Sequence, residues 1–329
     1  MKRLTAILTT TASFLLGAGS LAAEPALIFD LGGKFDKSFN EAAFTGAQRW
    51  VKETGGTYKE LEVQSATQRV QFARRMAESG ANPVVVMGFQ NEATLQEVAP
   101  DYPDTRFVLI DAVVDLPNVR SVIFAEQEGS YLTGMLAALA SKTGTVSFIG
   151  GMDIPLISAF GCGFAQGAKA VNPDVKILVN YTGDTPAAWN DPVKGAEIAK
   201  AQMSQGSDVI FAAAGGTGLG VLQAAADAGI FGIGVDSNQN HLHPGKVLTS
   251  MLKLVDNAVE QAFKDGPELT PGVVRMDLAA GGVDYARDDN NKDLITPEMT
   301  EKVEAARAAI TSGEIKVHDY RTDSSCPAF

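Results

Sequence analysis

Residues 26–53 read ALIFDLGGKFDKSFNEAAFTGAQRWVKE. The apolar run Ala26–Leu31 predicts a buried β-strand, and the amphipathic run Asn40–Glu53 predicts a helix that covers it. Two glycines and several polar residues lie between the two runs, as is usual where a strand turns into a helix. This stretch therefore predicts a β-α unit, the building block of an α/β domain with a parallel sheet.

The same alternation of strand and helix continues along the chain. Further strands are predicted at Pro83–Gly88, Arg106–Ala112, Thr145–Gly150, Lys176–Tyr181, Asp208–Ala214, Phe231–Val235 and Val247–Leu252. Further helices are predicted at Thr67–Ser79, Asn91–Pro100, Ser158–Ala170, Asp191–Gln205 and Gly218–Ala228. Alternation of this kind predicts parallel sheets covered by helices on both faces. Because the pattern restarts midway, we expect an α/β fold with two lobes of similar size, at residues 24–125 and 126–250.

The last part of the chain mixes both kinds of element. It contains a helix-like run Leu254–Lys264, a β-like run Gly272–Ala286 and a helix-like run Pro297–Ser312. A tail of this composition can cross back between the two halves. We therefore expect part of 250–290 to complete the first lobe and part of 285–329 to complete the second.

The first 23 residues have the layout of a secretory signal peptide. Lys2 and Arg3 give a positive start, and an apolar stretch follows at Leu4–Leu16. Small residues then lead to a cleavage point after Ala22 or Ala23. The apolar stretch is too short and too rich in threonine for a membrane span, and no cysteine stands at the cleavage point to carry a lipid. We expect an exported, periplasmic protein without a direct membrane anchor.

Charge and composition argue against several classes of protein. The chain has 27 Lys and Arg against 39 Asp and Glu, a net charge of −12, which argues against nucleic acid or an anionic membrane as a partner. Its three histidines form no HExxH motif, so we predict no metal and no cofactor. The two cysteines, Cys162 and Cys326, can pair in an oxidising compartment or remain as buried thiols, and the sequence leaves both alternatives open.

Candidate site residues follow predicted strands or stand near the start of predicted helices. In open parallel sheets, ligands lie beyond the carboxyl ends of the strands. Residues in such positions are Asp30, Phe39, Asn40, Asp111, Trp189, Gly215, Gly216, Asp236 and Lys253. Each also has a plainer interpretation, as a solvated or capping charge, a packed aromatic ring or a glycine-rich turn. The glycine spacing in Gly215–Gly220 differs from both the dinucleotide-binding motif and the P-loop.

As a set, these residues suit binding better than catalysis. The rings of Phe39 and Trp189 come from different halves of the chain, and a flat molecule between two such rings gains stacking energy. Carboxylates at strand ends accept hydrogen bonds from paired hydroxyl groups. No Ser/His/Asp or Cys/His arrangement accompanies them. We therefore predict a binding protein, not an enzyme, for a flat molecule that bears hydroxyl groups.

Five segments of the chain also match those of a known family. They are Asp30–Asn40 (DLGGKFDKSFN), Trp189–Gly195 (WNDPVKG), Gly215–Gly218 (GGTG), Val235–Gln239 (VDSNQ) and Thr249–Lys253 (TSMLK). With these segments, the chain resembles the basic membrane protein family of solute-binding proteins, which includes the purine nucleoside receptors of bacterial ABC transporters. The resemblance covers essentially all of the chain after the signal peptide.

The resemblance also implies roles for the candidate residues. Phe39 and Trp189 would stack on the two faces of the base, and Asn40 and Asp111 would bind its edge. The other candidates are expected on the ribose side: Asp30, Asp236 and Lys253, with the backbone of Gly215 and Gly216 nearby.

At the level of the whole chain, the resemblance implies a type I periplasmic-binding-protein fold, with two Rossmann-like lobes joined by a hinge. The implied function is capture of a purine nucleoside or related purine for the membrane permease of an ABC importer, and we expect a monomer. A sugar receptor, a nucleoside-processing enzyme and a sensory module remain as alternatives. The chain departs from the family pattern at Lys34-Phe35 and Thr185–Ala188, which border the base side of the cleft.

Overall fold

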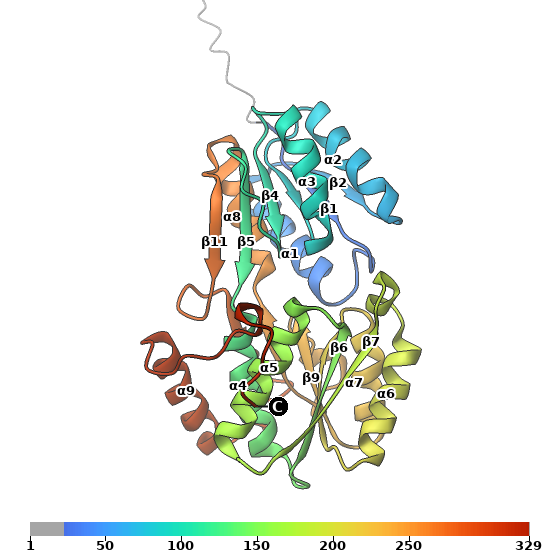
Figure 1. Cartoon of the computed structure of the whole chain (residues 1–329), viewed down its shortest axis with the longest axis vertical. Helices are drawn as coiled ribbons and strands as arrows, with labels where there is room; N and C mark the ends of the chain where they lie inside the picture. Colours follow the sequence, from blue (N-terminus) through green and yellow to red (C-terminus); the bar gives the residue numbers. More distant parts are fainter. Residues whose placement is uncertain (1–22, 329) are drawn as a thin grey trace, which may run out of the picture.

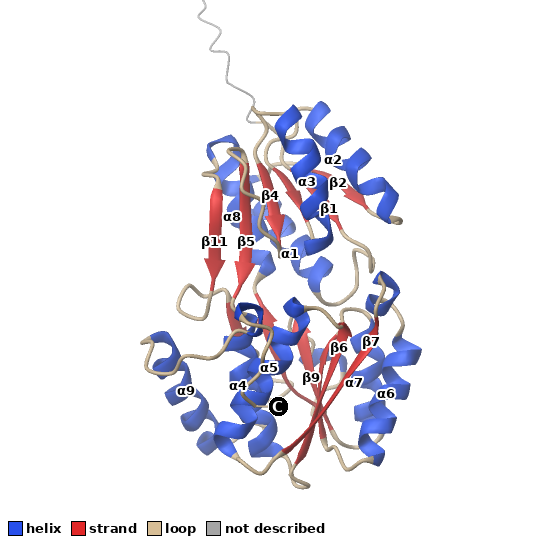
Figure 2. Ribbon diagram, viewed as in Figure 1, coloured by secondary structure: helices blue, strands red, loops and turns tan. Residues whose placement is uncertain are grey.

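Two lobes follow one another along the long axis of the molecule (Figure 1). The computed structural model describes residues 23–328, so the predicted signal peptide lies outside the described residues apart from Ala23. In residues 23–328, no helix is both long and apolar enough to cross a membrane. Each lobe is built on a six-stranded sheet with helices on both faces (Figure 2). This arrangement confirms the α/β class that the sequence predicts.

The first lobe contains a fully parallel sheet with strand order β11-β5-β4-β3-β1-β2. Its strands are β1 (Ala26–Phe29), β2 (Lys59–Glu62), β3 (Val84–Val86), β4 (Phe107–Ile110), β5 (Val119–Phe124) and β11 (Gly272–Met276). Its helices are α1 (Phe39–Thr54), α2 (Arg69–Glu78), α3 (Glu92–Val98) and α8 (Val255–Asp265). Every residue of β1 is buried, because α1 and α8 cover one face of the sheet and α2 and α3 cover the other.

The second lobe has the strand order β12-β10-β9-β8-β6-β7, in which only the pairing of β12 with β10 is antiparallel. Its strands are β6 (Thr145–Met152), β7 (Lys176–Gly183), β8 (Val209–Ala213), β9 (Phe231–Asp236), β10 (Val247–Lys253) and β12 (Val283–Tyr285). Its helices are α4 (Glu126–Ala140), α5 (Pro155–Val171), α6 (Pro192–Ser204), α7 (Thr217–Asp227) and α9 (Pro297–Thr311).

The hinge consists of the three segments in which the chain crosses between the lobes, at 124–126, 253–255 and 276–283. Backbone hydrogen bonds tie these crossings together. The N–H of Ala125 donates to the carbonyl oxygen of Met276 at 3.0 Å, and that of Leu254 donates to Gly282 at 2.9 Å. The crossings return β11 and α8 to the first lobe and place β12 and α9 in the second.

The predicted strands and helices are confirmed, with ends that shift by a few residues. One expectation is wrong in detail, because the β-like run Gly272–Ala286 contains two strands, β11 and β12, that belong to different sheets. Strands β2 and β5 and helix α4 are absent from the predicted elements. Strand β2 has the polar sequence KELE because it lies at a sheet edge. Helix α4 is buried along most of its length, so it shows no amphipathic period.

A disulfide joins Cys162 in α5 to Cys326 near the carboxyl end of the chain, with 5.6 Å between the two Cα atoms. The sequence leaves paired and free cysteines as alternatives, and the structure has the paired state. The bond links residues that are 164 positions apart and fastens the C-terminal segment to the second lobe.

Helices α4 and α5 touch through glycine residues. A Cβ atom at Gly134 would overlap the carbonyl oxygen of Phe164, and a Cβ atom at Gly167 would overlap that of Tyr131. A side chain at either position would therefore push the helix backbones apart. The pair forms a closely packed block beside the hinge, because α4 begins directly after the first crossing.

We expect Gly167→Ala to lower the free energy of unfolding by about 1–3 kcal/mol, because its methyl group must displace helix α4. Gly218→Ala in α7 is the matched control. Its Cβ atom would lie 3.5 Å from the side chain of Ala212, an ordinary contact, and alanine favours a helix over glycine. Urea denaturation followed by circular dichroism measures both variants. A Gly167→Ala protein as stable as the wild type would contradict the close helix contact.

Candidate ligand-binding site

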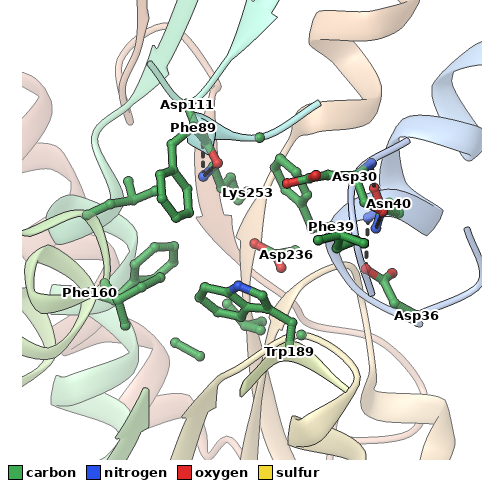
Figure 3. A pocket seen from close by; sticks show the side chains of 17 residues that line it. Asp30, Asp36, Phe39, Asn40, Phe89, Asp111, Phe160, Trp189, Asp236 and Lys253 are labelled. Atoms are coloured by element: carbon green, nitrogen blue, oxygen red, sulfur yellow. Dashed lines mark hydrogen bonds and ion pairs between the residues drawn. The ribbon is translucent and has the colours of Figure 1, made fainter. Parts of the chain in front are cut away.

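A pocket lies between the two lobes, at the carboxyl ends of strands from both sheets. The side chains that line it surround about 640 Å³ of space, which includes open solvent at its mouth. Figure 3 shows side chains from both lobes turned toward the same space. In residues 23–328, no group of three His, Cys, Asp or Glu side chains is arranged to hold a metal ion. Eight of the nine candidate residues line the pocket: Asp30, Phe39, Asn40, Asp111, Trp189, Gly215, Asp236 and Lys253.

Trp189 ends a short 3₁₀ turn before α6, and its ring lies on the backbone of Gly151 in β6, where a Cβ atom would overlap the ring. Two hydroxyl groups hold this turn in place. Thr182 and Thr217 donate hydrogen bonds to the carbonyl oxygen of Ala188 at 2.9 and 2.7 Å. The indole ring of Trp189 therefore has a fixed position in the second lobe.

Gly215 and Gly216 lie next to Trp189, at the start of α7. Gly215 lines the pocket and has a φ of +56°, a left-handed conformation that favours glycine. Gly216 lies outside the lining residues, and a Cβ atom there would be 3.3 Å from the carbonyl oxygen of Trp189. The structure therefore places Gly216 against the tryptophan turn, where a glycine leaves room for it.

The loop before α1 is shaped by two polar side chains. The carboxylate of Asp36 accepts the backbone N–H groups of Ser38, Asn40 and Glu41 at 2.8, 3.0 and 3.1 Å, which stabilises a negative charge at the start of a helix. The amide of Asn40 accepts the N–H of Asp30 at 3.1 Å and donates to its carbonyl oxygen at 3.2 Å. Both side chains thereby fix the orientation of Phe39, the first residue of α1, toward the pocket.

Asp30 follows β1 and lies beside Gly88, where a Cβ atom would overlap its carboxylate. Nη2 of Arg69 donates a hydrogen bond to Oδ1 of Asp30 at 2.8 Å. Burial raises the pKa of Asp30, and the neighbouring guanidinium group opposes this rise. Arg69 therefore sets the orientation of a pocket carboxylate, although it belongs to none of the motifs in the sequence.

Among the described residues that line the pocket, Lys253 is the one cation. Its Nζ atom lies 2.6 Å from Oδ1 of Asp111 and 3.1 Å from Oε1 of Glu126. Burial disfavours the charged form of Lys253, but the three carboxylates of Asp111, Glu126 and Asp236 outweigh burial and raise its pKa. Lys253 is therefore an ammonium ion at neutral pH and can donate hydrogen bonds into the pocket.

Asp111 follows β4 and Asp236 ends β9, so each lobe contributes one of these carboxylates. Both residues have a left-handed backbone, with φ of +77° and +62°, which aspartate tolerates better than most residues. Burial raises the pKa of each carboxyl group to about 6, and the charge of Lys253 opposes the rise. Surrounding contacts must therefore hold both residues in an unfavourable state, as is common in functional sites.

Hydrogen bonds cross the cleft beside Asp236. Oγ of Ser38 donates to Oδ2 of Asp236 at 2.5 Å, and Oγ of Ser237 donates to the carbonyl oxygen of Ser38 at 2.8 Å. Nε2 of Gln239 donates to the carbonyl oxygen of Lys37 at 2.9 Å. Ser38 and Lys37 belong to the first lobe and the other residues to the second, so these bonds hold the cleft closed on this side.

Several residues at or beside the pocket are not among the site residues predicted from the sequence. Phe89 comes directly after the predicted strand Pro83–Gly88, a position where ligand-binding residues are expected, but it is not among the predicted site residues. Leu156, Ile157 and Phe160 belong to α5, where apolar residues look like ordinary core. Glu126 opens α4 and reaches the site through Lys253. These contributions depend on how the lobes pack, which local sequence does not show.

A profile described as "ABC transporter substrate-binding protein PnrA-like" (Bmp) matches residues 24–321. A Lactococcus lactis subsp. cremoris protein named ABC transporter nucleoside-binding protein BmpA is 34% identical over 320 residues, which cover 89% of this chain and 88% of that protein. Basic membrane protein A of Borreliella burgdorferi is 31% identical over 318 residues, which cover 92% and 90%. The chain belongs to the Bmp family of ABC transporter substrate-binding proteins, as the sequence motifs predict.

Solved structures share the fold of this chain. A crystal structure of ABC transporter solute-binding proteins from Aeropyrum pernix K1 has a TM-score of 0.83 and 28% identity, and covers 92% of this chain and 95% of that chain. An ABC transporter solute-binding protein from Conexibacter woesei has a TM-score of 0.74 at 22% identity, with coverage of 91% and 99%, and shows the same fold. These likenesses confirm the predicted periplasmic-binding-protein fold.

We expect Asp236→Asn to stabilise the unliganded protein near pH 7.5 by about 1–3 kcal/mol, because the change removes a charge that burial disfavours. Asparagine keeps an acceptor for Ser38 and tolerates the positive φ. Below its raised pKa of about 6, the folded wild type takes up a proton at Asp236, so its stability rises as the pH falls toward about 4. The advantage of the variant should therefore disappear over this range.

Thermal unfolding at pH 7.5 and pH 4.5 measures this effect. Asp115→Asn, at an exposed position, is the control and should change the midpoint at neither pH. A destabilised Asp236→Asn protein at pH 7.5 would contradict the electrostatic cost that we assign to this carboxylate.

Proposed function

We propose that this member of the Bmp family captures a purine nucleoside between its lobes and delivers it to the permease of an ABC importer. The observation that carries the proposal is a pocket lined by aromatic rings, carboxylates and one ammonium group. Phe39, Phe160 and Trp189 offer surfaces for a flat base. The Lactococcus relative that is named a nucleoside-binding protein supports this class of ligand.

In this proposal, the base lies between Phe39 from the first lobe and Trp189 from the second. Asp111 and Asn40 bind its edge. The amide of Asn40 already bonds to the backbone of Asp30, so Asp111 has the more available acceptor atoms. A carboxylate accepts hydrogen bonds from N–H groups of a purine edge, and its charge would strengthen them in a buried site.

The ribose side consists of Asp30, Asp236 and Lys253. Neighbouring ribose hydroxyls donate to carboxylate oxygens, and the ammonium group of Lys253 donates to a ribose oxygen. A free base lacks these hydroxyls and would leave the buried charges without ligand partners. The ribose side would therefore discriminate nucleosides from bases, because unpaired buried polar groups weaken binding.

Closure of the hinge would complete the site. An open form would expose the strand ends of one lobe, and rotation at the crossings would bring the other lobe onto the ligand. The hydrogen bonds from Ser38 to Asp236 and from Gln239 to Lys37 join opposite lobes. They would therefore form on closure and favour the liganded state.

The cellular setting is part of the same proposal. We infer that the signal peptide directs the chain to the periplasm and is cleaved near Ala22 or Ala23, and that the mature protein acts as a monomer. The matching family model is described as a substrate-binding protein and the Lactococcus relative is named a nucleoside-binding protein, and the proposal contains no catalytic step.

Isothermal titration calorimetry with adenosine, guanosine, inosine, uridine, free purine bases, ribose and hexoses tests the function. We expect purine nucleosides to bind more tightly than free bases and sugars. Tight binding of free sugars alone would favour the sugar receptor, and no binding across the panel would refute the nucleoside assignment. Incubation with inosine should release no hypoxanthine, whereas turnover would indicate a nucleoside-processing enzyme.

Trp189→Ala should weaken nucleoside binding by at least about 1 kcal/mol, because one stacking surface is lost. Trp50→Phe is the control, since Trp50 packs edge-on against Phe263 with 5.4 Å between the ring centroids and is not a lining residue. This control also leaves Trp189 as the sole tryptophan of the two in the chain, so that its fluorescence reports on binding. Unchanged affinity in Trp189→Ala would remove this ring from the site.

A further inference from the structure

A row of alternating charges leads from the pocket toward the carboxyl end of the chain. Lys253 contacts Asp111 in the pocket and Glu126 on its other side, at 3.1 Å. Glu126 begins α4 at the first hinge crossing, and its side chain is 0% exposed. Its other oxygen, Oε2, lies 2.9 Å from Nη1 of Arg321. One shared carboxylate therefore separates Arg321 from the ammonium group that faces the ligand.

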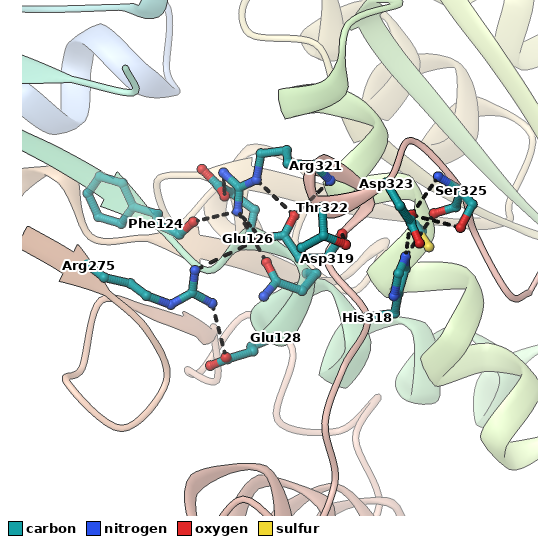
Figure 4. Close-up of polar contacts among 12 residues, drawn as sticks. Phe124, Glu126, Glu128, Arg275, His318, Asp319, Arg321, Thr322, Asp323 and Ser325 are labelled. Atoms are coloured by element: carbon teal, nitrogen blue, oxygen red, sulfur yellow. Dashed lines mark hydrogen bonds and ion pairs between the residues drawn. The ribbon is translucent and has the colours of Figure 1, made fainter. Parts of the chain in front are cut away.

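Arg321 also contacts the hinge directly. Its Nη2 atom donates a hydrogen bond of 3.0 Å to the carbonyl oxygen of Phe124, in the first crossing. Asp319 orients the guanidinium group by accepting hydrogen bonds of 2.8 Å from Nε and 2.9 Å from Nη2. Figure 4 shows the guanidinium group among Phe124, Glu126 and Asp319. Three groups, the carbonyl oxygen of Phe124 and the carboxylates of Glu126 and Asp319, thus fix this arginine beside the hinge.

The segment that carries Arg321 is attached to α5 at two places. The disulfide from Cys162 to Cys326 holds its end. The backbone N–H of His318 donates to Oε1 of Gln166 at 2.9 Å, and its carbonyl oxygen accepts from Nε2 of Gln166 at 3.0 Å. The family match ends at residue 321, so Cys326 lies beyond it. The second lobe therefore determines the position of the arginine.

We propose that Arg321 is a positioning residue for ligand binding, which acts on Lys253 through Glu126; the inference rests on the proposed function. Glu126 is buried and shared between two cations. Without Arg321, one of its oxygens would lose its partner in a medium that screens charge poorly. The carboxylate would then attract the ammonium group of Lys253 more strongly. The stronger attraction would draw the ammonium group of Lys253 toward Glu126, and therefore away from Asp111 and from the ligand.

A double-mutant cycle tests the relay with the nucleoside of the panel that binds most tightly. Arg321→Gln should weaken its binding at least about tenfold in calorimetry, because truncating one partner of a buried charge pair is costly. Glu126→Gln removes the charge through which Arg321 acts. In the Glu126→Gln background, Arg321→Gln should therefore cost less than about threefold. Arg321→Lys, which keeps the charge, should recover most of the affinity.

Arg307→Gln is the matched control, because this arginine pairs with Asp284 and Glu304 in the second lobe and is not part of the charge row. It should leave the affinity unchanged. The inference would be overturned if Arg321→Gln lowered the affinity equally in the wild-type and Glu126→Gln backgrounds. Arg321 would then act only by holding the C-terminal segment in place, and not through Glu126.

A crystal structure of the unliganded Arg321→Gln variant tests, without any ligand, whether Arg321 determines the position of Lys253. We expect Nζ of Lys253 to lie closer to Glu126 than to Asp111, the reverse of the distances of 3.1 and 2.6 Å in the wild type. An ammonium group that remains on Asp111 would overturn the inference. If the wild type binds no nucleoside of the panel, the proposed function fails, while this structure still decides the role of Arg321.

Discussion

The buried ammonium group of Lys253, at the hinge, connects the two lobes of this protein through ion pairs with Asp111 and Glu126. The side chain of Lys253 is 2% exposed, and the carboxylates around it keep it protonated. An unpaired charge in such a place costs several kcal/mol. Asp111 reaches it from the first lobe, while Glu126 reaches it from the start of α4. The ligand site and the hinge therefore share one set of charges, and neither can be rearranged without affecting the other.

The same charges explain why the pocket is an unfavourable arrangement in the absence of a ligand. Asp111 and Asp236 combine burial with a left-handed backbone, and each of these features costs stability. The surrounding fold offsets the cost through Lys253 and through the hydroxyl group of Ser38. A ligand with hydroxyl and N–H donors would satisfy the remaining acceptor atoms. In the proposed function, recognition would thus depend on groups that lower the stability of the empty protein.

Close backbone contacts give the site its shape. Trp189 lies on Gly151, and the carboxylate of Asp30 lies against Gly88. At both places a methyl group on the glycine would occupy the space of the side chain that lines the pocket. Helices α4 and α5 meet in the same way, through Gly134 and Gly167, which holds the two helices in close contact within the second lobe. Small residues therefore determine where the large and charged ones lie.

The sequence by itself determined the α/β class, most of the strands and helices, and eight residues that line the pocket. It did so because strand burial and helix periodicity are local properties, and because parallel strands always present their carboxyl ends to one side of a sheet. The roles of Arg69, Glu126, Phe160 and Arg321 needed the tertiary structure. In the sequence, their segments resemble ordinary charged surface or apolar core. Folding brings these side chains to the pocket or the hinge from distant segments, and the energy between buried charges depends on their distance in space and not on their separation along the chain.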